Sequence, residues 1–314
     1  MIEVMHSSKP NKKQLSSLTR KRIRITNLSF FLYVFPALFS FVLFKWWPII
    51  YSFALSYMKW NFVGAKHWVG LQNYARLFTH PHFHQAFVNT FIYIVALFPF
   101  FVVLPLLFAL LLSYIRNKSI QGLYRALLFI PTILAFSIVC LVWMWMYNPQ
   151  FGLFNNLLGL VGGKSISWLS DENYAIVSIV IVTGWKILGQ NLILYAAGLM
   201  MISNDYIEAA TIDGASQWKI FWKIKWPLLA PTTIYNVITA VNYATDKAFI
   251  PINVLTQGGP NEASTNLAYM IYVFGFNFFN IGLASSAAIF TSVLFLVITG
   301  LMMRGTGRLG YYEN

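Results

Sequence analysis

The sequence predicts an all-α, polytopic membrane protein with six transmembrane helices and both termini in the cytoplasm. Hydrophobic residues make up 58% of the 314 residues and charged residues only 10%, whereas soluble domains carry about 25% charged residues. Several apolar stretches exceed the roughly 20 residues that a helix needs to cross the hydrocarbon core. Lysine and arginine are also distributed unevenly between the loops, which orients the helices.

Apolar stretches between polar breaks mark the expected spans, which are 30–57, 86–114, 123–147, 174–200, 228–250 and 282–303. The first three contain proline, which removes backbone donors. Membrane helices tolerate this when neighbouring helices or water satisfy the freed groups, so we expect kinked, packed helices. Six crossings place both termini on one side of the membrane.

The basic residues choose that side. Fifteen lysines and arginines lie in the amino terminus, the 115–125 turn, the 201–227 loop and the carboxyl tail, against five in the alternate loops. Cytoplasmic loops carry such an excess. We therefore expect a basic cytoplasmic extension at 1–29, a six-helix transmembrane domain at 30–304 and a cytoplasmic tail at 305–314. The net charge of +13 then reports orientation rather than nucleic-acid binding.

The segment 205–231 is too polar to span the membrane. Asp205 followed by Glu208 has the spacing of a capping box, and Gly214 is placed to end a short helix in a left-handed conformation. Ser216 can cap a second helix, on which Trp218 and nearby aromatic residues share one side. We predict two short helices joined at Gly214, with an aromatic face.

The same segment resembles the signature of binding-protein-dependent ABC importer permeases. The matching residues are Glu208-Ala209-Ala210, Gly214 six residues after the glutamate, and the later run from Trp226 to Pro231. The resemblance implies that the loop docks on a separate ATPase subunit, which holds ATP and Mg²⁺, so that this chain is a permease subunit and not an enzyme. The residues expected to couple the two are Glu208, Ala209, Ala210, Gly214, Trp218, Phe221 and Trp222. The alternative is a loop that only connects two spans.

Two further stretches resemble the carbohydrate-import branch of this family, to which the maltose and glycerol-phosphate importers belong. They are 69–74 with 87–90, and Leu255-Thr256-Gln257-Gly258-Gly259-Pro260. The resemblance implies a second, homologous membrane subunit, an extracytoplasmic solute-binding protein and a saccharide substrate. It covers about residues 30 to 304, implies that these form a permease domain in the lipid bilayer of a bacterial inner membrane, and leaves the basic extension unexplained.

The resemblance also places substrate contacts on the fourth and fifth spans. The polar residues there are Thr183, Lys186, Gln190, Asn191, Asn242, Tyr243, Thr245 and Asp246. A charge within the membrane is costly and faces a cavity or a partner by default. We hypothesise that Lys186 lines the path and favours an acidic or phosphorylated saccharide; the alternative is a lysine paired with Asp246 or with a partner subunit.

Other functions have weaker support in the sequence. No GxSxG, HExxH or CxxC motif is present, so a catalytic nucleophile, a metal site or a bound cofactor is not expected. The histidines of 80–84 lack a nearby carboxylate in sequence. A secondary carrier coupled to an ion gradient is the main alternative, and a channel or scaffold is a third. The small residues around Ala284 and Ala288 fit either packing within the chain or a subunit interface.

Overall fold

The computed structural model describes residues 32–306, divided into a unit that ends at Ala54 and a unit that begins at Leu55. The described part of the first unit belongs to the helix Leu32–Ser56, whose 25 residues are enough to cross a membrane. This helix contains the π-helical turn η1 (Val42–Trp46) and ends as α2 (Trp47–Ser56). The predicted extension 1–29 and the last residues of the tail lie outside the described residues.

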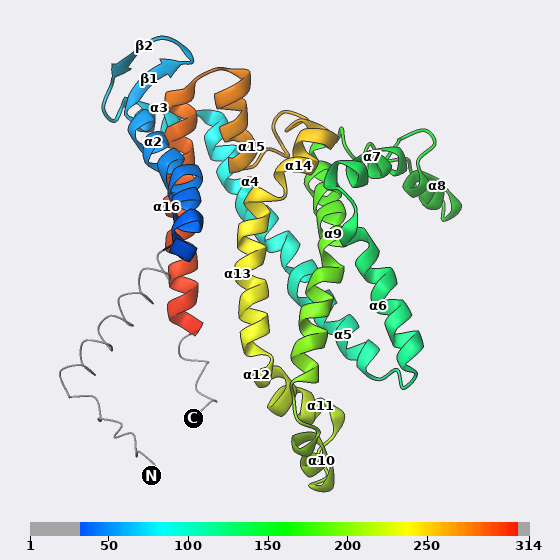
Figure 1. Cartoon of the computed structure of the whole chain (residues 1–314). Helices are drawn as coiled ribbons and strands as arrows, with labels where there is room; N and C mark the ends of the chain where they lie inside the picture. Colours follow the sequence, from blue (N-terminus) through cyan, green and yellow to red (C-terminus); the bar gives the residue numbers. More distant parts are fainter. Residues whose placement is uncertain (1–31, 307–314) are drawn as a thin grey trace, which may run out of the picture. The chain divides into compact units, whose positions relative to one another are not determined.

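The second unit is a helical bundle with small elements at both ends (Figure 1). Its rods are α4–η2–α5 (Pro81–Phe98, Pro99–Val103, Leu104–Ser113), α6 (Lys118–Ile133), α9 (Glu172–Met200), α13 (Ala230–Asp246) and α16 (Ile281–Thr306). One end carries β1 (Met58–Asn61), β2 (Val63–Trp68), α3 (Gln72–Thr79), α7 (Phe136–Met146), α8 (Leu153–Leu160), α14 (Phe249–Pro251), η4 (Ile252–Thr256), α15 (Leu267–Tyr272) and η5 (Val273–Asn277). The opposite end carries α10 (Asn204–Ile212), α11 (Gln217–Ile220), η3 (Phe221–Lys225) and α12 (Trp226–Leu228).

Four helices of the described chain are long and apolar enough to cross a membrane, and a bent pair would make a fifth. The four are Leu32–Ser56, Pro81–Ser113, Glu172–Met200 and Ile281–Arg304. They confirm four of the six predicted stretches to within a few residues.

The predicted span 123–147 is bent far more sharply than the expected kink. Its residues form α6 and α7, which meet at an angle of 98°. Pro131 lies in the last turn of α6, and Leu134 and Ala135 are extended, with ψ of 145° and 136°. Proline clashes with the preceding turn and removes a donor, so a helix breaks most easily close to it. The predicted kink is therefore a sharp break.

The predicted span 228–250 is also shorter than expected. It yields α13, a helix of 17 residues that does not reach the length of the four candidate spans. Polar side chains recur along it, among them Thr233, Asn236 and Asn242. Such residues lower the apolar character of a membrane helix and usually face other helices or a cavity.

The core of the bundle joins the rod α4–η2–α5 to α9 and α13. Tyr93 and Phe101 pack with Ile179 of α9 and Ala240 of α13, and all four are buried. α9 also approaches α6 closely at Gly189, where an added Cβ would lie 2.2 Å from the carbonyl oxygen of Leu128. Small residues allow such contact between helix backbones in a membrane.

The end that carries the strands is held by side chains that bond to backbone carbonyls. Asn89 Nδ2 donates to the carbonyls of Ala263 and Thr265, each at 2.9 Å, and Tyr93 Oη donates to that of Ser264 at 2.9 Å. Asn89, in one stretch that resembles the carbohydrate-import branch, is thus bonded to the segment that directly follows the other stretch, 255–260. Ala284 and its neighbouring serines on α16 are buried within the chain, which favours packing inside the chain for this small-residue face.

Candidate functional site

The loop that follows α9 forms two capped helical segments. Ser203 caps α10, because its Oγ accepts from the backbone N–H of Asp205 at 3.3 Å. Gly214 has φ of +75°, and the N–H of Ala215 bonds back to the carbonyl of Ala210 at 2.9 Å, as in a Schellman turn. Ser216 then caps α11 through the N–H of Lys219 at 3.3 Å. The predictions that Gly214 ends the first helix in a left-handed conformation and that Ser216 caps the second are confirmed.

The capping box predicted from Asp205 and Glu208 is wrong. Asp205 lies in the first turn of α10, and Ser203, two residues earlier, occupies the extended N-cap position. Serine and aspartate are about equally good caps, so the sequence offered two starting points. A carboxylate in the first turn still favours the helix, because the N-terminal end of the helix dipole is positive.

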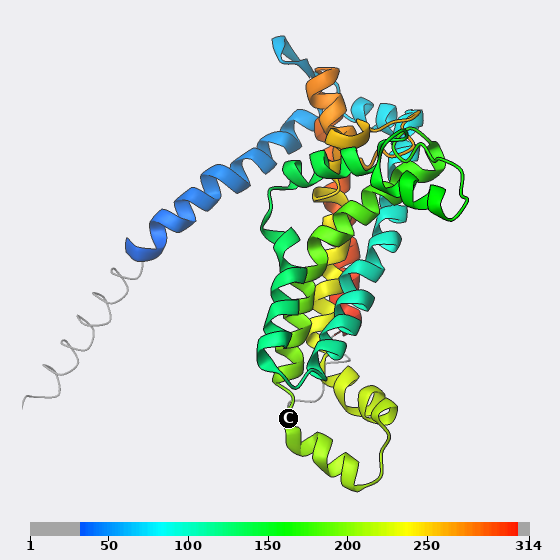
Figure 2. The same ribbon diagram turned by 90° about the vertical axis from the view of Figure 1, so that its right-hand side faces the viewer.

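α10 projects from the end of the bundle and buries none of its side chains (Figure 2). Glu208 and Ala209 are exposed, and Ala210 is half-buried. Two apolar residues of the same helix are also exposed, Tyr206 at 60% and Ile212 at 86%. The motif comparison missed both, although large apolar side chains in a polar loop were a visible signal. Together these residues form a free surface that suits contact with another protein.

Of the three aromatic residues predicted to form a docking face, Trp218 and Trp222 are exposed and Phe221 is half-buried. Phe221 and Trp222 lie with ring centroids 5.0 Å apart, and Trp222 and Trp226 lie 5.7 Å apart. Phe221 and Trp226 pack on a buried cluster that includes Leu106 and Leu229. Trp218 stays 71% exposed. Phe221 and Trp226 therefore pack against the bundle, Trp218 and Trp222 stay accessible, and α10 adds a second exposed surface.

The polar residues predicted on α9 face the interior of the chain. Thr183 and Asn191 are buried, and Thr183 Oγ1 and Asn191 Nδ2 have no hydrogen-bond partner among the described atoms. Gln190 is half-buried. None of the three lines the polar groove described below.

Lys186 is engaged at the break between α6 and α7. Its Nζ donates to the carbonyls of Leu134 at 2.6 Å and of Pro131 and Thr132 at 3.2 Å each. These carbonyls belong to the last turn of α6 and the extended link, where no helical N–H is available to them. The ion pair of Asp246 that the structure shows is with Lys247, at 3.1 Å. Lys186 thus supplies the hydrogen-bond donor for three carbonyls at the end of α6. Neither sequence hypothesis included this arrangement.

A polar groove of about 560 Å³ lies between α13 and α16. It is lined by Asn242, Thr245 and Asp246 from the predicted set. The remaining lining residues come from α16 and are Thr291, Ser292, Phe295, Leu296 and Thr299. Hydroxyl and amide groups beside an aromatic ring suit the hydroxyl-rich faces of a polar solute.

Two findings refine the predicted set of groove residues. Tyr243 turns away from the groove to pack edge-on against Phe101, with centroids 5.3 Å apart. The sequence prediction missed the residues of α16, although Thr291, Phe295 and Thr299 recur every four residues, as on one helical face.

The histidines of 80–84 lie at the end of the bundle that carries the strands. There a carboxylate from a distant part of the chain approaches one of them. His82 Nδ1 contacts Glu262, which the fold brings from the loop before α15. Within residues 32–306, however, no three His, Cys, Asp or Glu side chains gather as a metal site would require.

Comparisons with known proteins agree with this architecture. Residues 75–305 match the family described as binding-protein-dependent transport system inner membrane component. The "Probable ABC transporter permease protein YesP" of Bacillus subtilis is 30% identical over 94% of this chain and 95% of its own length. The sn-glycerol-3-phosphate transport system permease protein UgpA of Brucella suis is 31% identical over 88% of this chain and 94% of its own.

A solved structure shares the fold. It is that of a bacterial ABC transporter involved in the import of the acidic polysaccharide alginate, with a TM-score of 0.81 and 23% identity over 93% of this chain and 99% of that one. The family match covers well over half of the sequence, and the curated relatives align over nearly all of it. The chain therefore belongs to the family of binding-protein-dependent transport system inner membrane components.

Proposed function

We propose that this chain is a membrane subunit of an ATP-driven importer and forms part of the translocation path for a saccharide or a related polyol. A partner ATPase supplies the energy, and an extracytoplasmic binding protein delivers the solute. The observation that carries the proposal is α10, which projects from the bundle with every side chain at least partly exposed. A segment that only connected α9 to α13 would have no need of a capped helix with exposed Tyr206 and Ile212.

Glu208→Lys tests the proposed ATPase contact. In vesicles that contain the assembled transporter, the variant should insert normally and lose most ATP-driven uptake, because a reversed charge on an exposed helix disturbs binding more than folding. Lys164→Glu is the control, since it reverses a charge in the exposed loop between α8 and α9, at the opposite end of the bundle. Normal uptake by Glu208→Lys would reduce the loop to a connector.

The same vesicles separate the importer from its main alternative. A secondary carrier would transport without nucleotide and respond to an ion gradient. The importer requires ATP and the binding protein, and ATP-independent uptake at full rate would contradict the proposal. Membership of the binding-protein-dependent family favours the importer.

The proposed path is the groove between α13 and α16, with a second, homologous membrane subunit as its other wall. Hydroxyl and amide groups from both helices line it, and relatives of this chain are named for sn-glycerol-3-phosphate transport. Thr291→Val keeps the shape of the side chain and removes one hydroxyl group, so it should weaken uptake. Ser292→Ala tests the neighbouring hydroxyl. If both variants transport at the normal rate, the groove is not the path.

The proposed topology has six crossings with both termini in the cytoplasm. In this proposal the bent α6–α7 pair, which could count as a fifth span, and the 17-residue helix α13 supply the two crossings beyond the four long helices. Cys140 is the only cysteine and is buried, so a Cys140→Ala background allows single cysteines to be labelled from either side. Cysteine at Ser203 should react only from the cytoplasm and cysteine at Lys164 only from outside. The reverse pattern would invert the topology.

A further inference from the structure

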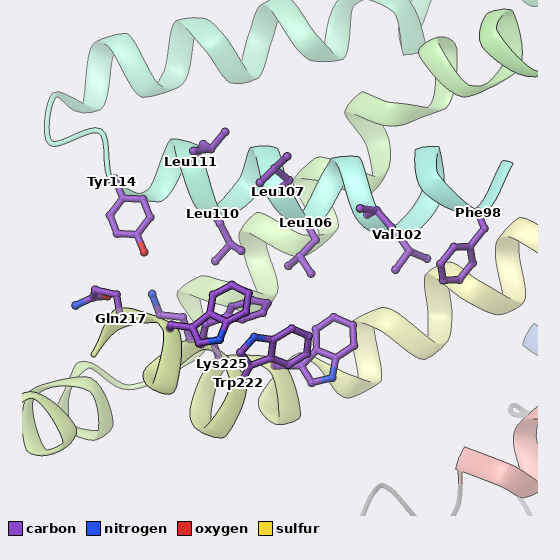
Figure 3. Close-up of a pocket in the computed structure, with 14 residues that line it drawn as sticks. Phe98, Val102, Leu106, Leu107, Leu110, Leu111, Tyr114, Gln217, Trp222 and Lys225 are labelled. Carbon is purple, nitrogen blue, oxygen red and sulfur yellow. The ribbon is translucent and has the colours of Figure 1, made fainter. Parts of the chain in front are cut away.

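A second groove, of about 510 Å³, lies between the rod α4–η2–α5 and the segment that follows Gly214 (Figure 3). Leucines of α5, among them Leu106 and Leu110, face the aromatic cluster of η3 and α12 across it. Its volume falls within the range of about 300–1,000 Å³ that is typical of ligand pockets. The groove lies apart from the polar path, and three of the residues expected to contact the ATPase, Trp218, Phe221 and Trp222, form part of its wall.

One wall of the groove belongs to a helix that is long and apolar enough to cross a membrane. Val103, Leu107 and Leu111 line it, are exposed, and stand four residues apart on one helical face. They belong to the candidate span Pro81–Ser113. At the end of this span the lining changes to Tyr114 and tryptophans, the residue types that concentrate at the boundary between membrane and water. The lining thus changes from the apolar residues of the candidate span to the residue types that are typical of that boundary.

Lys225 is the one charged side chain in the lining of this groove. Its Nζ lies 5.7 Å from the ring centroid of Tyr114, and neither ion pair of the described chain includes it. Burial lowers the pKa of Lys225, because a cation removed from water without a counter-charge loses hydration energy. An anion at the mouth of the groove would restore that charge balance.

We propose that this groove binds an anionic phospholipid, with an acyl chain along the leucines of α5 and the phosphate beside Lys225. A phospholipid combines the required parts in the required order, since its apolar tail lies at hydrocarbon depth and its phosphate lies at the boundary. The occupied groove would brace the aromatic cluster against α5. This links the lipid composition of the membrane to the segment that continues from α10.

A titration of the full-length chain in detergent tests the proposal. Phosphatidylglycerol or phosphatidylcholine with the same acyl chains is added in increasing amounts. Native mass spectrometry then measures how many molecules of each lipid stay bound to the chain. The wild-type chain should retain phosphatidylglycerol preferentially. Lys225→Gln should weaken that retention about five-fold, as expected for the loss of about 1 kcal/mol of attraction per basic residue. Lys219→Gln is the matched control, because Lys219 is exposed and lies outside the groove lining.

A second variant tests the acyl-chain part independently. Leu107→Trp places a larger side chain on the exposed wall of the groove and should reduce retention of both lipids, without disturbing a buried contact. Equal retention of the two lipids by the wild-type chain, or equal losses in Lys225→Gln and Lys219→Gln, would overturn the proposal. Retention of a second copy of the chain in place of lipid would also overturn it, since a protein would then fill the groove.

Discussion

Replacing Gly214 with valine should destabilise the turn that joins α10 to α11. Gly214 has φ of +75°, and a Cβ added there meets no heavy atom within 4 Å. The cost therefore comes from the backbone alone, about 1–2 kcal/mol for an ordinary residue in the left-handed region. A β-branched side chain at positive φ should cost more, and asparagine should cost less. Since 1.4 kcal/mol is a factor of ten in a population, valine should open the turn in about ten times as many molecules.

Hydrogen exchange measures this opening directly. The amides of Gly214 and Ala215 donate to the carbonyls of Thr211 and Ala210 at 3.0 and 2.9 Å, so their exchange should accelerate in the order asparagine, alanine, valine. ATP-driven uptake should fall in the same order, while insertion stays normal because α10 buries no side chain. Gly122→Val is the control, since Gly122 is exposed on α6 and a Cβ added to it also meets nothing within 4 Å.

Two results would refute this reasoning. Exchange at the turn that is unchanged in Gly214→Val would show that the left-handed conformation is not what holds it. Equal effects of asparagine and valine would show that the backbone cost does not set the outcome.

Three further substitutions have outcomes set by single contacts. Ser203→Ala removes the cap of α10 and should cost about 1 kcal/mol of helix stability; unchanged amide exchange along α10 would contradict this. Lys186→Met leaves three carbonyls at the end of α6 without their donor, and should lower thermal stability by about 1–3 kcal/mol, whereas normal stability with altered substrate charge preference would favour a role in the path. Gly189→Ala forces a methyl group against the carbonyl of Leu128 and should destabilise by about 1–3 kcal/mol, while Gly159→Ala, in open space, should melt like the wild-type chain.

Much of the local structure of the segment 203–216 could be predicted because its determinants are local. The positive φ of Gly214 and the cap at Ser216 depend on neighbours within a few residues, and both are confirmed. The start of α10 was placed wrongly for the same local reason, because Ser203 and Asp205 are competing caps. Tyr206 and Ile212 are conspicuous in the loop sequence, but their exposure depends on how α10 lies against the bundle, which it contacts through the half-buried Ile207.

The polar residues of the spans were harder to assign. Each was recognised as unusual in a membrane helix, but hydropathy does not say what a helical face meets. The fold places Asn242 and Thr245 in a groove with α16 and buries Thr183 and Asn191 inside the chain. Lys186 meets the end of α6, more than fifty residues earlier in the chain.

The class of protein, four of its long helices and the turn at Gly214 follow from the amino-acid sequence, because hydrophobicity and backbone preference act between near neighbours. Three features emerge only in three dimensions: the 98° break between α6 and α7, the pairing of α13 with α16 around a polar groove, and the packing of the aromatic cluster beneath α5. These features depend on contacts between residues far apart in the chain. Such contacts are set by how helices pack, and one sequence read along its length does not contain that geometry explicitly.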